Sequence, residues 1–133
     1  MKSLFLIFCL LILSCHAVRI KNPCSIYNDK CYDEVCGTIS DKWLNNKEGS
    51  IIKGDKLFWE LFFQQNNECF INIKYEDIVN HLGLGEVMNE SNNIIRLRYA
   101  VKDRRSESTM FVYFIYSSKK EVIKVEIAEE FID

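Results

Sequence analysis

An uninterrupted apolar run from Leu4 to Leu13 follows the positive charge of Lys2 at the start of the chain. A membrane-spanning helix needs about 20 residues, so this run is too short to cross a bilayer. It has the length of a signal-peptide core, and the small residues after it suit a cleavage site following Ala17. We therefore expect residues 1–17 to be a signal peptide and residues 18–133 to form one secreted domain.

Two other interpretations of this segment remain open. Ile12-Leu13-Ser14-Cys15 also resembles a bacterial lipobox, in which acylation of Cys15 anchors an exported lipoprotein to a membrane surface. The run could instead be a buried N-terminal helix, but no polar residue interrupts it to provide a solvated face. Signal cleavage and acylation both predict export.

The charge and composition of residues 18–133 limit the partners of the domain. Lys2 is the only charged residue of the predicted signal, so its removal changes the net charge from −2 to −3. Nucleic-acid binding needs a strongly basic face, and no second apolar segment reaches membrane-spanning length. We therefore expect no nucleic-acid partner and no membrane span. We also expect no cofactor, because the sequence holds no complete catalytic or metal-binding signature.

Four cysteines remain after position 17, namely Cys24, Cys31, Cys36 and Cys69. An even number of cysteines in an exported domain indicates disulfides, here two, with three possible pairings. Because three of the four lie close together, we expect at least one bridge to Cys69. A metal site is the alternative, but the six residues between the first two cysteines exceed the spacing usual for paired zinc ligands. We therefore predict no metal.

Hydrophobic periodicity predicts two helices. The first covers residues 28–46, where Asn28 can cap and the apolar positions form one stripe ending at Trp43. The second covers residues 76–84 and is closed by glycine.

The segments between these helices are less regular. We expect residues 47–56 to form a loop, and the dense apolar stretch 57–63 to be either a buried strand or the end of a helix. Residues 64–68 are turn material, and residues 69–75 alternate in the manner of a strand.

Three strands are predicted near the C-terminus, over residues 94–101, 110–116 and 122–127. Their short links imply an antiparallel meander. Alternation places Val122 and Lys124 on one face of the third strand, and Ile123 and Val125 on the other face. The middle strand is apolar on both sides, so its second side is either covered or forms a binding face. The element order predicts an α+β fold, with N-terminal helices packed on a curved antiparallel sheet.

This order of elements resembles the cystatin-like and nuclear transport factor two-like α+β cone domains, in particular their small secreted nematode versions. The resemblance covers residues ~38–131 and rests on Lys42-Trp43-Leu44, on the run Leu57-Phe58-Trp59-Glu60-Leu61-Phe62-Phe63, on Cys69 before the second helix, and on the final meander. It implies a hydrophobic pocket between sheet and helices, either filled by side chains or open to a ligand. Enzymes with this fold commonly hold an Asp–His or Tyr–Asp pair in the cone. No such pair can be matched here, so no catalytic residue carries over.

Few residues are candidates for chemistry. Glu60 interrupts an apolar run and would be a general acid if buried, although pairing with Lys56 four residues away is the favoured interpretation. Asp77 is the other candidate acid. His81, the only histidine after position 17, has no visible partner and is expected at the surface or at a helix end.

Two further patterns concern residues expected at the surface. Asn89-Glu90-Ser91 is an N-glycosylation sequon, which predicts a glycan on Asn89 in a eukaryotic source. Arg96 and Arg98 alternate on one strand and Arg104-Arg105 follow it, a pattern that could form an anion-binding patch unless nearby glutamates neutralise it.

We expect a secreted binding or interaction protein without enzymatic activity, whose partner is an unknown protein or a small hydrophobic ligand. The alternatives are a carrier with a cavity between helices and sheet, a lipoprotein acylated at Cys15, and an enzyme using Glu60 or Asp77.

Overall fold

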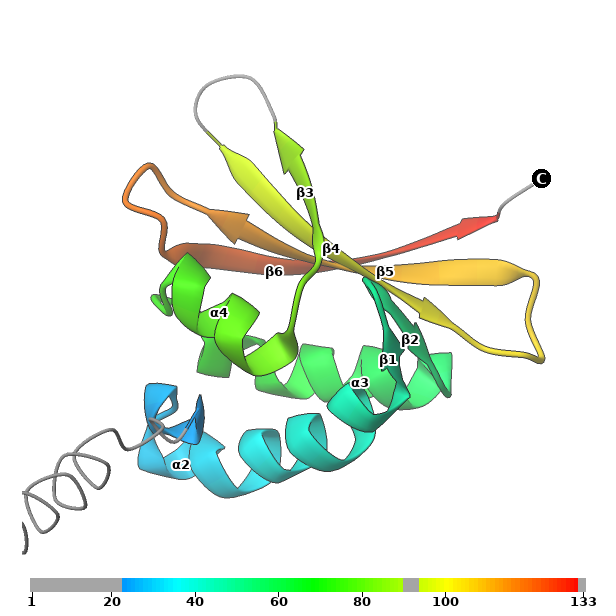
Figure 1. Ribbon diagram of the computed structural model, residues 1–133, viewed down its shortest axis with the longest axis horizontal. Coiled ribbons are helices and arrows are strands. Elements are labelled where there is room, and N and C mark those ends of the chain that lie inside the picture. Colours follow the sequence, from blue (N-terminus) through cyan, green and yellow to red (C-terminus); the bar gives the residue numbers. More distant parts are fainter. Residues whose placement is uncertain (1–22, 90–93, 132–133) are drawn as a thin grey trace, which may run out of the picture.

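The computed structural model describes residues 23–89 and 94–131, so the predicted signal segment and Cys15 lie outside the described residues. Helices pack on one side of an open, twisted sheet of six described strands (Figure 1). This arrangement confirms the α+β class. No helix within the described ranges is long and apolar enough to cross a membrane.

The first helical segment confirms the prediction for residues 28–46. It comprises η1 (Pro23–Ile26), α2 (Asp29–Cys31), π-helical turns η2 (Tyr32–Cys36) and η3 (Ile39–Trp43), and the 3-10 turn η4 (Leu44–Asn46). The Asn28 side chain accepts a 2.9 Å hydrogen bond from the backbone N–H of Cys31, which satisfies one of the free donors at the helix start. Of the predicted stripe, Val35, Ile39 and Trp43 are fully buried, whereas Tyr32 is 39% exposed.

The ambiguous apolar stretch 57–63 belongs to α3 (Lys56–Asn66). The Asp55 side chain caps this helix by accepting hydrogen bonds from the backbone N–H groups of Leu57 and Phe58. Trp59 and Phe63 are buried four residues apart, as expected for one helical face. The helix continues through Gln64–Asn66, where we expected a turn.

The strand predicted for residues 69–75 is wrong. The 3-10 turn η5 (Asn67–Phe70) is followed by a bend in which Asn72 has a φ of 68°, and α4 (Tyr75–Leu82) then begins. A left-handed residue interrupts an extended strand, and the only bridge here pairs Lys74 with Glu121. Phe70 and Ile73 are both buried, which matches a turn rather than strand alternation.

The sheet contains β1 (Lys47–Glu48), β2 (Ile51–Lys53), β3 (Glu86–Asn89), β4 (Ile95–Lys102), β5 (Ser108–Tyr116) and β6 (Val122–Phe131). Its order is β1-β2-β4-β5-β6, with β3 also paired to β4. The meander β4-β5-β6 is antiparallel as expected, whereas β2 runs parallel to β4. The β1–β2 hairpin and β3 were not predicted, because both are short and lie in segments that resemble loops.

A β-bulge changes the predicted alternation in β6. The pairing shifts between Ile115 and Tyr116, so that Tyr116 pairs with Val122 and Ile115 pairs with Lys124. One extra residue on a bulged strand reverses the side on which the preceding residues lie. Val122 therefore joins the core on the same side as Val125, contrary to the prediction, while Ile123 is 52% exposed.

Two disulfides stabilise the helical layer, as the cysteine count predicted. They join Cys24 to Cys36 and Cys31 to Cys69. The second bridge ties the N-terminal segment to the turn before α4 and is the expected bridge to Cys69. Such pairs are typical of proteins from oxidising compartments.

Candidate functional site: the outer face of the sheet

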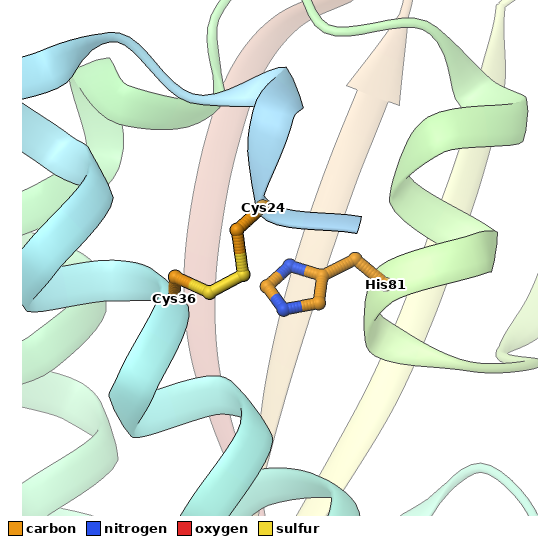
Figure 2. A group of neighbouring side chains, drawn as sticks. All are labelled: Cys24, Cys36 and His81. Carbon is orange, nitrogen blue, oxygen red and sulfur yellow. A yellow bond between two sulfur atoms is a disulfide. The ribbon is translucent and has the colours of Figure 1, made fainter. Parts of the chain in front are cut away.

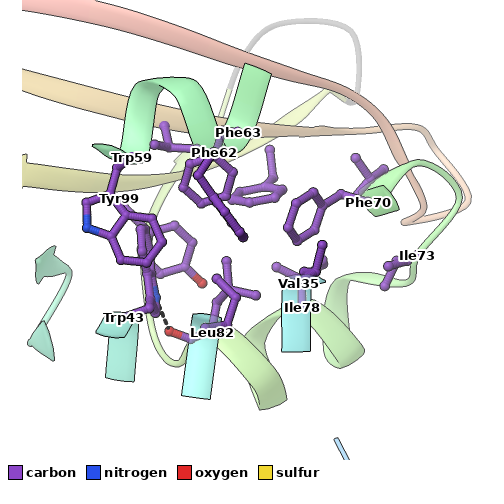
Figure 3. Packing of buried hydrophobic residues seen from close by; sticks show 14 of the residues in the cluster. Val35, Trp43, Trp59, Phe62, Phe63, Phe70, Ile73, Ile78, Leu82 and Tyr99 are labelled. Carbon is purple, nitrogen blue, oxygen red and sulfur yellow. Dashed lines mark hydrogen bonds between the residues drawn. The ribbon is translucent and has the colours of Figure 1, made fainter. Parts of the chain in front are cut away.

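Aromatic rings fill the space between the helices and the sheet (Figure 3). Trp43 meets Trp59, Phe63 and Tyr99 edge-on, with ring centroids 5.0 to 5.4 Å apart. Phe63 continues this packing to Phe70, and further rings reach β5. These side chains are buried, and close-packed interiors leave few voids larger than a water molecule. The region in which a carrier would hold its ligand is thus occupied by side chains.

His81 lies in the last turn of α4, so the helix-end alternative is confirmed, but it is buried in the helical layer and not at the surface. The residue is 1% exposed, and its Nδ1 lies 2.6 Å from the hydroxyl of Tyr27. Burial raises the pKa of Tyr27, which keeps the hydroxyl protonated. The hydroxyl and Nδ1 share this hydrogen bond, and Nε2 has no hydrogen-bond partner in the described part of the chain. Burial also lowers the pKa of His81 to about 4, so the ring is neutral at physiological pH.

The imidazole of His81 faces the Cys24–Cys36 disulfide (Figure 2). The two sulfurs and a ring nitrogen lie within 4.8 Å of one another, a geometry that could hold a metal ion if the sulfurs were thiolates. They are joined in a disulfide, and thiolates are the form of cysteine that binds metals. In the oxidised protein this cluster is therefore a structural contact.

The two candidate acids are not brought together. Glu60 lies half-buried on α3, and Asp77 lines a shallow hollow of about 360 Å³ beside Lys74. Neither carboxylate has a hydrogen-bond or ion-pair partner among the described residues. The expected pair of Glu60 with Lys56 is absent, because Lys56 instead contacts Glu129 at 2.5 Å. Glu68 and Lys74 line the same hollow as Asp77, but no hydrogen bond or ion pair joins either of them to Asp77. Within the described part of the chain, the geometry therefore shows no coupled general acid–base pair at Glu60 or Asp77.

The arginines predicted as one patch are divided between two places. Arg104 and Arg105 line a polar hollow of about 490 Å³ next to the start of α3. Asp55 and Asp103 also line it, and each uses its carboxylate to accept a backbone N–H. Arg96 and Arg98 lie elsewhere, on the outer face of β4.

The outer face of the sheet is the side opposite the helices, and no described helix covers it (Figure 1). It carries a second cluster of buried residues, made of Ala100, Phe111, Tyr113 and Ile115. Phe111 and Tyr113 are each only 8% exposed. Long side chains of neighbouring strands cover these rings: the Arg98 guanidinium lies 4.5 Å from the ring centre of Phe111, and that of Arg96 lies 5.8 Å from Tyr113.

Cross-strand register arranges this face in rows. One row runs Glu86, Arg98, Tyr113 and Glu126 across β3, β4, β5 and β6. Arg98 donates to Glu86 at 2.7 Å, and this hydrogen bond raises the pKa of Arg98. A hydrogen bond from Lys124 lowers the pKa of Glu126. On this face, arginine and aromatic side chains lie together, and ion pairs hold Arg98 and Glu126 to neighbouring side chains.

The second apolar side of β5 was predicted from the sequence, as a side either covered or free to bind. The stacking of Arg98 on Phe111 was missed. Arg98 and Phe111 are thirteen positions apart, so their contact depends on the β4–β5 register, which sequence spacing does not specify.

Comparison with protein-family models, with curated proteins and with solved structures gives no significant match. The resemblance to cone domains therefore stays a prediction.

Proposed function

We propose that this chain is a secreted, non-enzymatic interaction domain that binds a folded protein partner through the outer face of its sheet. The observation that carries the proposal is the position of Arg98 and Phe111, a guanidinium stacked on a ring on a sheet face that no described helix covers. Arginine, tyrosine and other aromatic residues are the types enriched at the energetic centres of protein interfaces. A broad, preformed face suits a protein surface better than a small molecule.

The packed interior favours this proposal over the carrier alternative. The enzyme alternative has less support, because neither Glu60 nor Asp77 has a hydrogen-bonded or ion-paired partner among the described residues. The two disulfides are consistent with export, and the predicted signal peptide supplies the route. Asn89, the predicted glycan acceptor, is the last residue of β3, and the rest of its sequon falls outside the described residues.

Site-specific photocrosslinking tests the proposal. A photoreactive amino acid replaces Met88 or Ala128 at the border of the outer face, and Leu57, which is 61% exposed on α3, serves as the matched control. In native extracellular fluid, we expect the two outer-face positions to capture the same protein and Leu57 not to capture it.

Arg98→Glu provides the second arm of this experiment. The purified captured protein should bind the Arg98→Glu variant at least about tenfold more weakly, since truncating a central arginine typically costs more than 1 kcal/mol. Leu57→Glu should bind like the parent. Equal binding by both variants would remove the outer face as the site.

A further inference from the structure

Strand β6 forms one edge of the sheet and is open along most of its length. Only its first residue is covered: the N–H of Val122 donates to Ile73 at 2.9 Å, and its carbonyl accepts from Asn72 at 2.8 Å. From Lys124 to Phe131, no described segment other than β5 hydrogen-bonds to the backbone of this strand.

An open edge of this length can add another strand, and natural proteins usually shorten, cover or charge such edges. The open part of β6 carries charges, and Lys124 lies 2.8 Å from Glu126 of the same strand. Large apolar side chains are nevertheless exposed next to its start and at its end. Ile123 is 52% exposed and Phe131 is 78% exposed. On the outer face between them, charges of both signs occur, with Lys124 near one end and Glu130 near the other.

We infer that β6 pairs antiparallel with β6 of a second copy of this chain. The two copies are related by a two-fold axis that is perpendicular to the sheet and passes between their directly opposed Ile127 residues. This register places Lys124 opposite Glu130 of the second copy, twice by symmetry. It also brings Ile123 to Phe131 of the second copy, so that both exposed apolar ends are covered. Opposite charges in directly opposed positions stabilise a strand pair.

Neighbouring registers are less favourable. A two-fold axis at Glu126 sets this carboxylate against its own copy, and an axis at Ala128 sets Glu126 against Glu130 twice. Like charges in opposed positions destabilise strand pairs. An axis at Val125 pairs Lys124 with Glu126, but the strands then reach Val122, whose backbone is already bonded to Asn72 and Ile73. The sequence of β6 therefore selects the axis at Ile127.

The pairing goes beyond the proposed function, because it requires no partner on the outer face. It would make one continuous sheet from two copies and place both outer faces on the same side. Eight open residues per chain form an interface at the small end of the known range, so the dimer should be weak and concentration-dependent.

Sedimentation of the purified exported protein tests the charge pair. We expect reversible dimerisation, which Lys124→Glu or Glu130→Lys each weakens about tenfold, because an attractive pair becomes repulsive twice per dimer. The double variant Lys124→Glu/Glu130→Lys should restore dimerisation to within about threefold of the parent, since opposed charges are again opposite in sign. Lys119→Glu, the same charge change in the turn before β6, should have no effect.

Cysteine crosslinking tests the register by a separate route. Residues at the two-fold axis have Cα atoms about 5 Å apart across the antiparallel pair, within disulfide range. Ile127→Cys should therefore crosslink to itself under oxidised glutathione, and Val125→Cys should crosslink only when mixed with Glu129→Cys. A monomer at every concentration, a charge swap without rescue, or self-crosslinking of Val125→Cys would overturn the inference.

Discussion

The indole Nε1 of Trp43 donates a 2.9 Å hydrogen bond to the carbonyl oxygen of Leu82, in the last turn of α4 (Figure 3). Both residues are fully buried. The carbonyl groups at a helix end lack partners within the helix, so this bond satisfies an acceptor that burial would otherwise leave unpaired. The same indole meets Trp59, Phe63 and Tyr99, and thus joins the first helical segment to α3, α4 and the sheet.

Replacing Trp43 by phenylalanine should lower the free energy of unfolding by about 2–4 kcal/mol, because the variant loses ring volume and leaves the Leu82 carbonyl unpaired. Chemical denaturation measures this change. Leu44→Ala is the control at the next position, where the side chain is 41% exposed, and it should cost less than about 1 kcal/mol.

The buried His81 predicts how stability depends on pH. Its pKa falls from 6.5 to about 4 on folding, so the unfolded state binds more protons between these values. The contribution of neutral His81 to the free energy of unfolding is complete above about pH 6.5. It should decrease by about 3 kcal/mol as the pH falls toward 4. Denaturation midpoints across this range give the slope.

A double variant separates His81 from the carboxylates that also titrate in acid. His81→Leu/Tyr27→Phe removes both polar partners of the 2.6 Å hydrogen bond, and so leaves no unpaired hydroxyl. Its stability should change less between pH 6.5 and 5 than that of the parent. An unchanged slope would show that His81 is not responsible.

The two disulfides should differ in their contribution to stability. Cys31–Cys69 closes a loop of 38 residues and Cys24–Cys36 closes one of 12. In the chain-entropy account these loops correspond to about 4 and about 3 kcal/mol, respectively. Paired Cys→Ala variants, compared by thermal unfolding, should therefore show the greater loss for Cys31/Cys69. The opposite order would indicate that strain or residual unfolded structure dominates.

The two sides of β5 should respond differently to truncation. Phe114 is fully buried in the main core, so Phe114→Ala should cost about 3–5 kcal/mol. Phe111 lies beneath Arg98 on the outer face, and Phe111→Ala should cost less than about half as much, because neighbouring side chains and solvent can occupy the space. Partner binding should show the reverse order, with the larger loss for Phe111→Ala.

Sequence patterns predicted the elements whose periodicity is long and regular. The first helical segment, α4 and the three-strand meander were placed within a few residues. The failures have local causes. The apolar periodicity of residues 57–63 allowed a strand or a helix. The Asp55 side chain caps the start of α3 and so favours the helix. Asn72 in a left-handed conformation ends the alternation of residues 69–75, a feature that hydrophobic pattern does not encode.

The candidate site was only partly predictable for a related reason. The sequence predicted that β5 is apolar on both sides. The pairing of β4 with β5 places Arg98 over Phe111 on the outer side of β5. The burial of His81 likewise depends on Tyr27, 54 positions away. Contacts of this kind follow from the register and packing of the whole domain, which a local pattern does not contain.

The intact mass of the exported protein, measured under native conditions with and without reductant, tests the central claim most directly. A secreted interaction domain with a filled interior predicts the mass of residues 18–133, lower by four hydrogens until the two disulfides are reduced, with no bound small molecule and with hexoses if Asn89 is glycosylated. A bound apolar molecule would contradict the filled interior and indicate a carrier. A mass that begins at Cys15 and includes acyl chains would contradict a released domain and place the protein on a membrane surface.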